Sequence, residues 1–64
     1  MEFNKKLKNA REQKGMTQAE LGQIAGVAQA TICDIETGAK KPKLETAVKL
    51  CRALNVKLED MVEV

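Results

Sequence analysis

Residues that stop helices divide this chain into five short stretches, each with apolar residues at the three- and four-residue spacing of an α-helix. Gly15, Gly26 and Gly38 follow the first three stretches, and Asn55, which tolerates the left-handed backbone conformation, follows the fourth. The loops between the stretches are short, so the chain is predicted to be all-α and to pack as one compact unit. We expect no strand, and helices over residues 3–14, 17–25, 28–36, 44–54 and 58–62.

The expected helices differ in how much apolar surface they carry. The second begins with the capping box TQAE, in which the Thr17 side chain caps the backbone and Glu20 reaches back to it. Its apolar stripe is Leu21, Ile24 and Ala25. The fourth is apolar around most of its circumference, so it is predicted to be the central and most buried helix. Its apolar residues are Leu44, Ala47, Val48, Leu50, Cys51, Ala53 and Leu54.

Size and composition indicate one small domain over residues 1–64. A chain of 64 residues buries only about 60% of its unfolded surface, which makes its stability marginal. Phe3 is the only aromatic residue, so the core must be aliphatic. The net charge of +2 permits nucleic acid as a partner without arguing strongly for it. Neither a signal peptide nor an apolar run of membrane length is found, so a cytoplasmic location is expected.

The chain has two cysteines, Cys33 and Cys51, and no histidine. Two thiols cannot supply the roughly four ligands of a zinc site, so we expect no metal and no cofactor. Two free thiols are expected, and a redox-sensing role or a structural bridge are the alternatives. Because the sequence has no histidine, no nucleophile–base pair and no phosphate-cradling loop, it argues against an enzyme.

Residues 17–37 contain two short helices joined by the tight glycine turn AGVA, which is the shape of a helix-turn-helix and also of other helical hairpins. In the second of these helices, Ile32 and Ile35 are expected to face inward. At about 100° per residue, the outward face is then Ala30, Cys33, Asp34 and Thr37, with Gln29 on its border.

Three motifs carry a resemblance to a known family: KGMTQAEL, IETGAKKP and ALNVKLEDM, at the spacing that they have here. The chain resembles the Cro and C1-type phage repressors, also called the xenobiotic-response-element family, over residues 7–62. The resemblance implies a compact five-helix, lambda-repressor-like domain that binds double-stranded DNA. It also implies that residues 28–36 form the recognition helix in the major groove, with the preceding helix lying across the phosphates.

The resemblance also assigns roles to single residues. Gln18 and Gln29 match DNA-contacting glutamines, and the amide of Gln29 can pair with adenine N6 and N7, with a solvated glutamine as the alternative. Arg11 and Glu36 match a pair that ties the first helix to the end of the recognition helix, and Gly26 matches the turn glycine. The residues expected to contact DNA are Thr17, Gln18, Ala28, Gln29, Ala30, Thr31, Cys33, Asp34, Lys40, Lys41 and Lys43.

The expected recognition helix has no basic residue and carries Asp34 and Glu36, so the attraction to DNA must come from elsewhere. The basic loop KKPK, residues 40–43, follows this helix and can reach phosphates. The helix N-termini at residues 17–18 and 28–29 offer free N–H groups and the positive end of the helix dipole. Phosphate contacts then supply most of the affinity, and base contacts supply the choice of sequence.

The chain departs from the family's pattern at several positions. Ala28 and Lys57 stand where a helix-capping Ser, Thr or Asp is usual, and a lost cap costs about 1 kcal/mol. Gly22 stands where the family prefers Ala, which costs about 1 kcal/mol of helix propensity. Asp34 stands where a basic or amide residue is common. We expect these departures to affect affinity more than fold.

The sequence predicts a DNA-binding transcriptional regulator, and more narrowly a repressor that binds a palindromic operator as a dimer, because one domain alone reads too few bases. The tail, residues 56–64, is expected to form the dimer contact, with burial in the same chain as the alternative. An antitoxin-like protein-interaction module, which has a protein partner and also binds its own promoter, is the alternative function. The tail residues expected in the dimer contact are Val56, Met61, Val62 and Val64.

Overall fold

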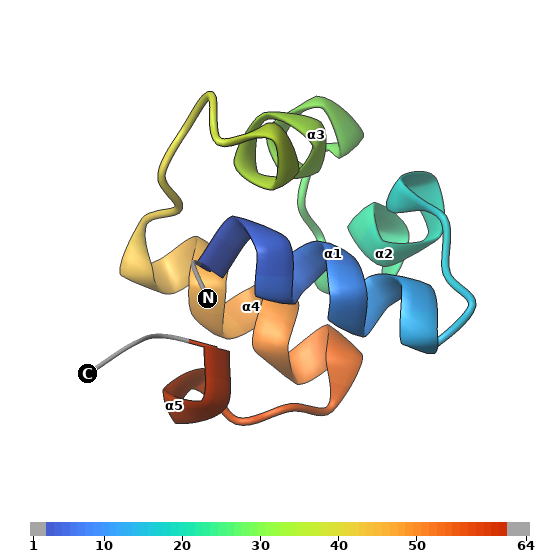
Figure 1. Ribbon diagram of the computed structural model, residues 1–64. Coiled ribbons are helices and arrows are strands. Elements are labelled where there is room, and N and C mark those ends of the chain that lie inside the picture. Colours follow the sequence, from blue (N-terminus) through green and yellow to red (C-terminus); the bar gives the residue numbers. More distant parts are fainter. Residues whose placement is uncertain (1–2, 62–64) are drawn as a thin grey trace.

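The computed structural model describes residues 3–61, and these residues form five helices without a strand. Figure 1 shows α3 at the opposite end of the molecule from α5. Helix α2 packs on both α3 and α4, whereas α1 packs on α3 and α5. The all-α, five-helix prediction is confirmed. The helices are α1 (Phe3–Gln13), α2 (Gln18–Ala25), α3 (Gln29–Thr37), α4 (Leu44–Leu54) and α5 (Leu58–Met61).

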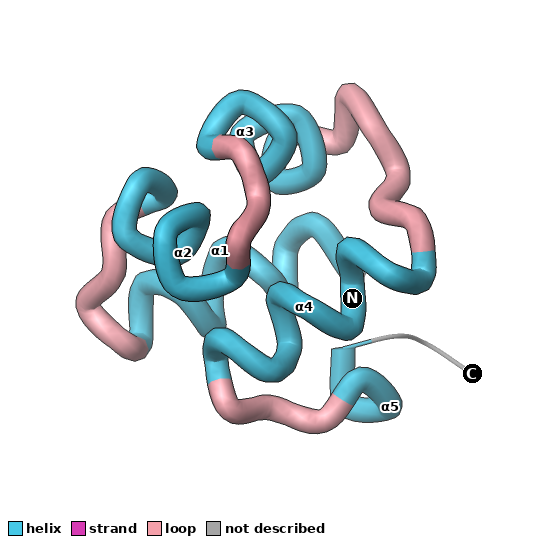
Figure 2. Tube along the Cα trace, turned by 180° about the vertical axis from the view of Figure 1, so that it is seen from behind, coloured by secondary structure: helices cyan, strands magenta, loops and turns pink. Residues whose placement is uncertain are grey.

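The helix ends follow the local signals in the sequence. The Thr17 hydroxyl accepts a hydrogen bond from Glu20 N at 3.1 Å, and Thr17 N donates to Glu20 Oε1 at 3.0 Å, which confirms the capping box. Gly26 and Asn55 end α2 and α4 with φ of 71° and 56°, the left-handed conformation that stops a helix. Ala28 precedes α3 and gives it no side-chain cap. The loops that join the helices are drawn in pink in Figure 2.

The core is aliphatic, as expected from the shortage of aromatic residues. Helix α4 buries more residues than any other described helix, which confirms that it is the most buried. Phe3 is partly buried and packs against the edge of this core. Within residues 3–61, no helix combines the length and apolar character needed to cross a membrane. The buried cluster is Leu7, Leu21, Ile32, Ile35, Leu50, Cys51, Leu54 and Met61.

Two residues expected on buried apolar faces are exposed instead: Ile24 is 60% exposed and Leu44 is 71% exposed. The buried side of α2 runs through Leu21 and Gly22, and Ile24 lies about 100° around the helix from the centre of that side. Leu44 is the first residue of α4, so fewer residues of the chain surround it than surround the middle of that helix.

The structure also corrects part of the expected dimer contact. Met61 is only 4% exposed and lies in the core, because α5 packs on both α1 and α4. The alternative of burial within the same chain is therefore the correct one for Met61. Val56 is partly buried and also packs against the core. Val62 and Val64 lie outside the described residues.

Gly22 allows a close backbone approach that the sequence did not predict. A Cβ atom at this position would lie 2.6 Å from the carbonyl oxygen of Val27, which is too close for any side chain. The chain folds back over α2 here, because Gly26 N and Val27 N both donate to Gly22 O, at 2.9 and 3.0 Å. Gly22 therefore makes room for the turn between α2 and α3, and its weak helix propensity is secondary.

Candidate nucleic-acid interface

Helix α3 has one buried side and one open side. Ile32 and Ile35 lie in the core, and the side chain of Glu36 is also buried. The opposite side is open or partly open to solvent, so the predicted outward face is confirmed. In Figure 1 this helix lies at the edge of the molecule, where an elongated partner can reach it. The residues of the outward face are Gln29, Ala30, Cys33, Asp34 and Thr37.

A buried ion pair holds α3 against α1. Arg11 Nε donates to Glu36 Oε2 at 2.7 Å, and Arg11 Nη2 donates to Glu36 Oε1 at 2.9 Å. The remaining guanidinium nitrogen, Arg11 Nη1, donates a hydrogen bond to the carbonyl oxygen of Met16 at 2.7 Å. The two side chains are only 11% and 3% exposed. The pair that the family resemblance implied is therefore present, in the two-bond geometry that favours Arg with a carboxylate.

The charged state of Glu36 is stabilised despite its burial. Burial alone raises the pKa of Glu36, but hydrogen bonds from Arg11 and Gln18 outweigh it, so the pKa lies below its ordinary value of 4.5. The hydrogen bond to Glu36 in turn raises the pKa of Arg11. Both groups are therefore charged at neutral pH, and their charges cancel inside the protein.

Gln18, the first residue of α2, also bonds to this pair. Its Nε2 donates to Glu36 Oε1 at 3.1 Å. The sequence predicted Gln18 as a DNA contact but did not predict its partner. The two residues are 18 positions apart, and no local signal connects them. The side chain of Gln18 is partly exposed, so it lies between the buried ion pair and the solvent.

The N-termini of α2 and α3 differ in how they are capped. Thr17 and Glu20 cap the start of α2, and the backbone hydrogen bond from Thr17 lowers the pKa of the exposed Glu20 carboxyl. At the start of α3, Ala28 offers no cap, and Gln29 begins the helix in an exposed position. The first N–H groups of α3 therefore have no side-chain acceptor from Ala28, and they can bond an external acceptor such as a phosphate.

The basic loop returns to the C-terminal part of α3 at Asp34. Lys40 Nζ lies 3.5 Å from Asp34 Oδ2, and Lys40 N donates to Asp34 O at 3.1 Å. The hydroxyl of Thr37 donates to the same carbonyl at 3.2 Å. The negative charge of Asp34 therefore has a positive neighbour within the protein, which the sequence did not predict.

Thr31 lies beside the basic loop instead of on the outward face. It lines a small hollow with the lysines of residues 40–43 and with Thr46, near the start of α4. Two hydroxyls and three lysines thus line one depression beside α3, together with Ile35 and Pro42. This composition suits an anion, since hydroxyls donate hydrogen bonds and ammonium groups supply positive charge.

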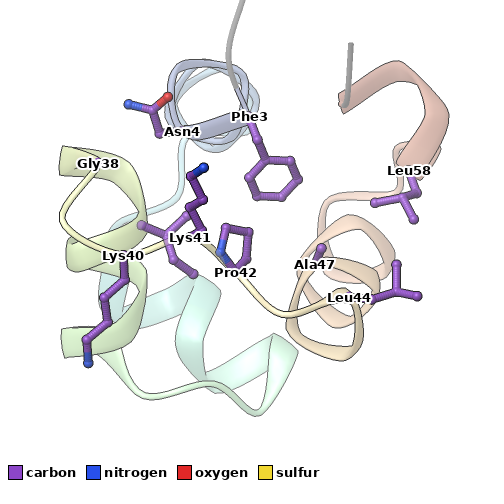
Figure 3. A pocket seen from close by; sticks show the side chains of 10 residues that line it. Phe3, Asn4, Gly38, Lys40, Lys41, Pro42, Leu44, Ala47 and Leu58 are labelled. Carbon is purple, nitrogen blue, oxygen red and sulfur yellow. The ribbon is translucent and has the colours of Figure 1, made fainter. Parts of the chain in front are cut away.

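An apolar groove lies where α1, the basic loop, α4 and α5 meet (Figure 3). Its apolar lining includes Phe3, Pro42, Leu44 and Leu58. Figure 3 shows that Lys41 extends toward Phe3, whereas Lys40 extends away from the groove. The exposed Leu44 thus belongs to a larger apolar surface.

The two cysteines are free thiols, as predicted. Cys33 is exposed on the outward face of α3, and Cys51 lies in the core. Burial raises the pKa of the Cys51 thiol, so it stays protonated and unreactive at neutral pH.

The sequence model of the helix-turn-helix family matches residues 7–61. The chain belongs to this Cro/C1-type helix-turn-helix family. It is 39% identical over 56 residues to YgzD, an uncharacterised transcriptional regulator of this type in Bacillus subtilis strain 168, covering 88% of this chain and 85% of that protein. It is 32% identical over 60 residues to RstR, a transcriptional repressor of the cryptic phage CTXphi in Vibrio cholerae, covering 94% of this chain and 54% of that protein.

A solved helix-turn-helix structure has the same fold. SinR of Bacillus subtilis, a master regulator for biofilm formation solved in complex with DNA, superposes with a TM-score of 0.91. The sequence identity is 26%, over 95% of this chain and 98% of that chain. A helix-turn-helix consists of two consecutive short helices joined by a tight turn, and α2, the turn at Gly26 and α3 have this arrangement. The lambda-repressor-like fold expected from the sequence is confirmed.

Proposed function

We propose that the chain is a sequence-specific, double-stranded DNA-binding transcriptional regulator whose α3 enters the major groove. The observation that carries this proposal is the outward face of α3, which is free of core contacts and has the basic loop at its end. The match to a helix-turn-helix family and the likeness to DNA-bound SinR support it. Helix α2 then lies across the backbone, with Thr17 and Gln18 at its phosphate-facing end.

In this proposal phosphates supply the affinity. Lys41 and Lys43 are exposed and form no ion pair with an acidic side chain within residues 3–61, whereas Lys40 pairs with Asp34. The uncapped start of α3 at Ala28 adds backbone donors. Together these groups explain how a recognition helix without a basic residue is attracted to DNA, since phosphate neutralisation dominates binding to a duplex.

Base reading is assigned to the outward face of α3. The amide of Gln29 stands at the exposed start of the helix and can bond adenine N6 and N7. Asp34 can accept a hydrogen bond from cytosine N4 one turn further along. If Asp34 reads a base, Asp34→Ala should tighten binding to random DNA and reduce the ratio of the affinity for the operator to the affinity for random DNA. If Asp34→Ala tightens binding to the operator and to random DNA by the same factor, Asp34 reads no base and only repels phosphates. Ala30, Thr31 and Cys33 complete the proposed contact surface.

We further propose that the protein is a repressor and binds a palindromic operator as a homodimer. The apolar groove supports a contact between two copies, because Leu44 and Leu58 line it and Leu44 is 71% exposed. Acidic Glu45 and Glu59 follow these two leucines in the sequence, and Lys41 lies on the other side of the groove. A twofold arrangement can therefore place opposite charges around an apolar centre. Val56, Val62 and Val64 remain part of this proposal.

The dimer is tested by measuring molecular mass by light scattering. Leu44→Asp should give monomers and weaken binding to a symmetric operator. Ile24→Asp is the matched control, because Ile24 is also a large, exposed apolar residue but lies on α2 and does not line the groove. A wild-type protein that is already monomeric at the concentrations of operator binding would refute the dimer.

A second candidate is an antitoxin-like module that binds both a protein and its own promoter. The exposed apolar residues Ile24 and Leu44 favour it, and SinR has also been solved in complex with the protein SinI. A stoichiometric protein partner that co-purifies from cells and stays bound without DNA would support this candidate.

The DNA-binding proposal itself is tested by selecting bound duplexes from random DNA. Wild-type protein should enrich one sequence motif with twofold symmetry. Gln29→Ala should enrich a motif that has lost its preference at one position of each half-site. Recovery of random sequences by the folded wild-type protein would refute sequence-specific binding.

A further inference from the structure

The carboxylate of Glu36 accepts more hydrogen bonds than a tie between two helices requires. Glu36 is the buried charged residue among the described residues, and its two oxygens accept two bonds from Arg11 and one from Gln18. The two Arg11 bonds join α1 to α3 by themselves. The third bond extends the network to Gln18, the first residue of α2 and one of the residues expected to contact DNA.

This third bond determines which way the Gln18 amide points. An uncharged glutamine amide has one accepting oxygen and an NH₂ group with two donors. Only the NH₂ group can face the carboxylate, because the alternative brings two accepting oxygens together at 3.1 Å. With one N–H bound to Glu36, the second N–H of Gln18 is left for a partner at the partly exposed start of α2.

We propose that Glu36 is a positioning residue for DNA binding, which orients the Gln18 amide so that its free N–H meets a backbone phosphate. This inference rests on the proposed DNA-binding function. Glu36 itself does not touch DNA, since its side chain is 3% exposed. Its negative charge is balanced by Arg11, so the network presents a donor to the phosphate without adding a repulsive charge.

The positioning role is separated from a purely structural one by a double-mutant cycle on DNA affinity. The first change is the pair Arg11→Met and Glu36→Leu, which removes the ion pair without leaving a buried charge and without altering the net charge. The second change is Gln18→Ala. Dissociation constants for one selected duplex are measured at one salt concentration and at a temperature where circular dichroism shows every variant folded.

We expect the R11M/E36L pair to weaken binding about 3- to 10-fold when Gln18 is present, which is the net effect of one hydrogen bond. The same pair of changes should have almost no effect in the Q18A background, since no amide is left to orient. Equal weakening in both backgrounds would overturn the proposal and leave Glu36 as a structural tie only. No weakening in either background would overturn it as well.

A conservative variant keeps the test usable if R11M/E36L does not fold. Glu36→Gln retains an oxygen that can accept from Arg11 and Gln18, so its affinity for the duplex should stay within about twofold of wild type even where stability falls. A larger loss in folded E36Q, with Q18A also weakened, would contradict orientation by a hydrogen-bond acceptor at residue 36.

The side-chain NH₂ resonances of Gln18 provide a readout without DNA. In wild type they should show restricted motion, and in R11M/E36L they should show the free motion of a solvated glutamine. Equal mobility in both would overturn the positioning role. If wild-type protein binds no duplex, the proposed function fails together with this inference. If wild type binds but the cycle is additive, only the inference fails.

Discussion

Nε of Arg11 lies 2.7 Å from Oε2 of Glu36, and this contact joins α1 to α3 across 25 positions of the sequence. The side chain of Glu36 is buried against α1, whereas the α3 residues proposed to meet DNA are open or partly open to solvent. Because both side chains are largely buried, removal of one partner leaves the other charge without compensation, which typically costs about 3–5 kcal/mol. The orientation of the proposed recognition helix therefore depends on a charged contact as well as on the aliphatic core.

The first prediction concerns acid. The pKa of Glu36 is lower in the folded protein than its ordinary 4.5, so its stabilisation is fully present above that value. It is lost as the pH falls through the folded pKa, since the unfolded chain then binds more protons. We expect the free energy of unfolding, measured by urea denaturation, to fall as the pH drops below about 5 and to go on falling through the lowered pKa of Glu36.

R11M/E36L is the comparison for this measurement. It should lose less stability over the same range, while Glu20, whose pKa is also lowered, contributes equally to both proteins. Identical slopes for the two proteins would show that Glu36 is not responsible for the acid sensitivity.

Gly22→Ala should destabilise the protein, although alanine is the better helix former. The new Cβ would meet Val27 O at 2.6 Å, and relief of that contact must move the backbone of the turn between α2 and α3. We expect a loss of about 1–3 kcal/mol in the free energy of unfolding. Gln23→Ala, on the exposed side of the same helix, is the control and should change stability by less than about 0.5 kcal/mol. A gain in stability for G22A would contradict the close approach.

Ala28→Ser should stabilise the protein by about 0.5–1 kcal/mol, because a serine hydroxyl can accept a bond from the uncapped start of α3. Its effect is read as a rise in melting temperature. Ala30→Ser is the matched control, since residue 30 lies inside α3 and cannot cap it. The cap interpretation is wrong if both substitutions shift the melting temperature equally.

Changing Lys40 and Lys41 to Ala should weaken DNA binding by similar factors on all sequences. The slope of log K against log salt should shrink by roughly one for each lost phosphate contact. The slope should decrease less in Lys40→Ala than in Lys41→Ala, since Lys40 is already paired with Asp34. Lys49→Ala is the control, because Lys49 is paired with Glu45 on α4. An unchanged slope in both variants would mean that Lys40 and Lys41 are exposed to solvent and contact no phosphate.

The sequence predicted the helices well because their limits are set locally. Thr17 and Glu20 bond each other within one turn, and Gly26 and Asn55 take the left-handed conformation that stops a helix. The inward position of Ile32 follows from the same short-range periodicity. The Arg11–Glu36 pair came from the family resemblance, since spacing alone does not connect residues so far apart.

The errors and omissions concern contacts between helices. Ile24 was placed inward because it fits a helical stripe, but the side of α2 that is buried depends on where α3 and α4 lie. Met61 was assigned to a second copy, although α1 and α4 cover it within the chain. The Gln18–Glu36 bond and the Asp34–Lys40 pair likewise need the tertiary arrangement, which periodicity does not contain.

Reading of bases by α3 is tested most directly by two affinities measured at one salt concentration, for the selected operator and for a random duplex. Gln29→Ala should weaken operator binding by roughly 1–3 kcal/mol, about 5- to 150-fold, and leave binding to the random duplex unchanged. Replacement of the adenine that Gln29 is proposed to read should abolish this difference between wild type and Q29A. Equal losses on both duplexes, or no loss on the operator, would contradict sequence-specific recognition through Gln29 at the start of α3.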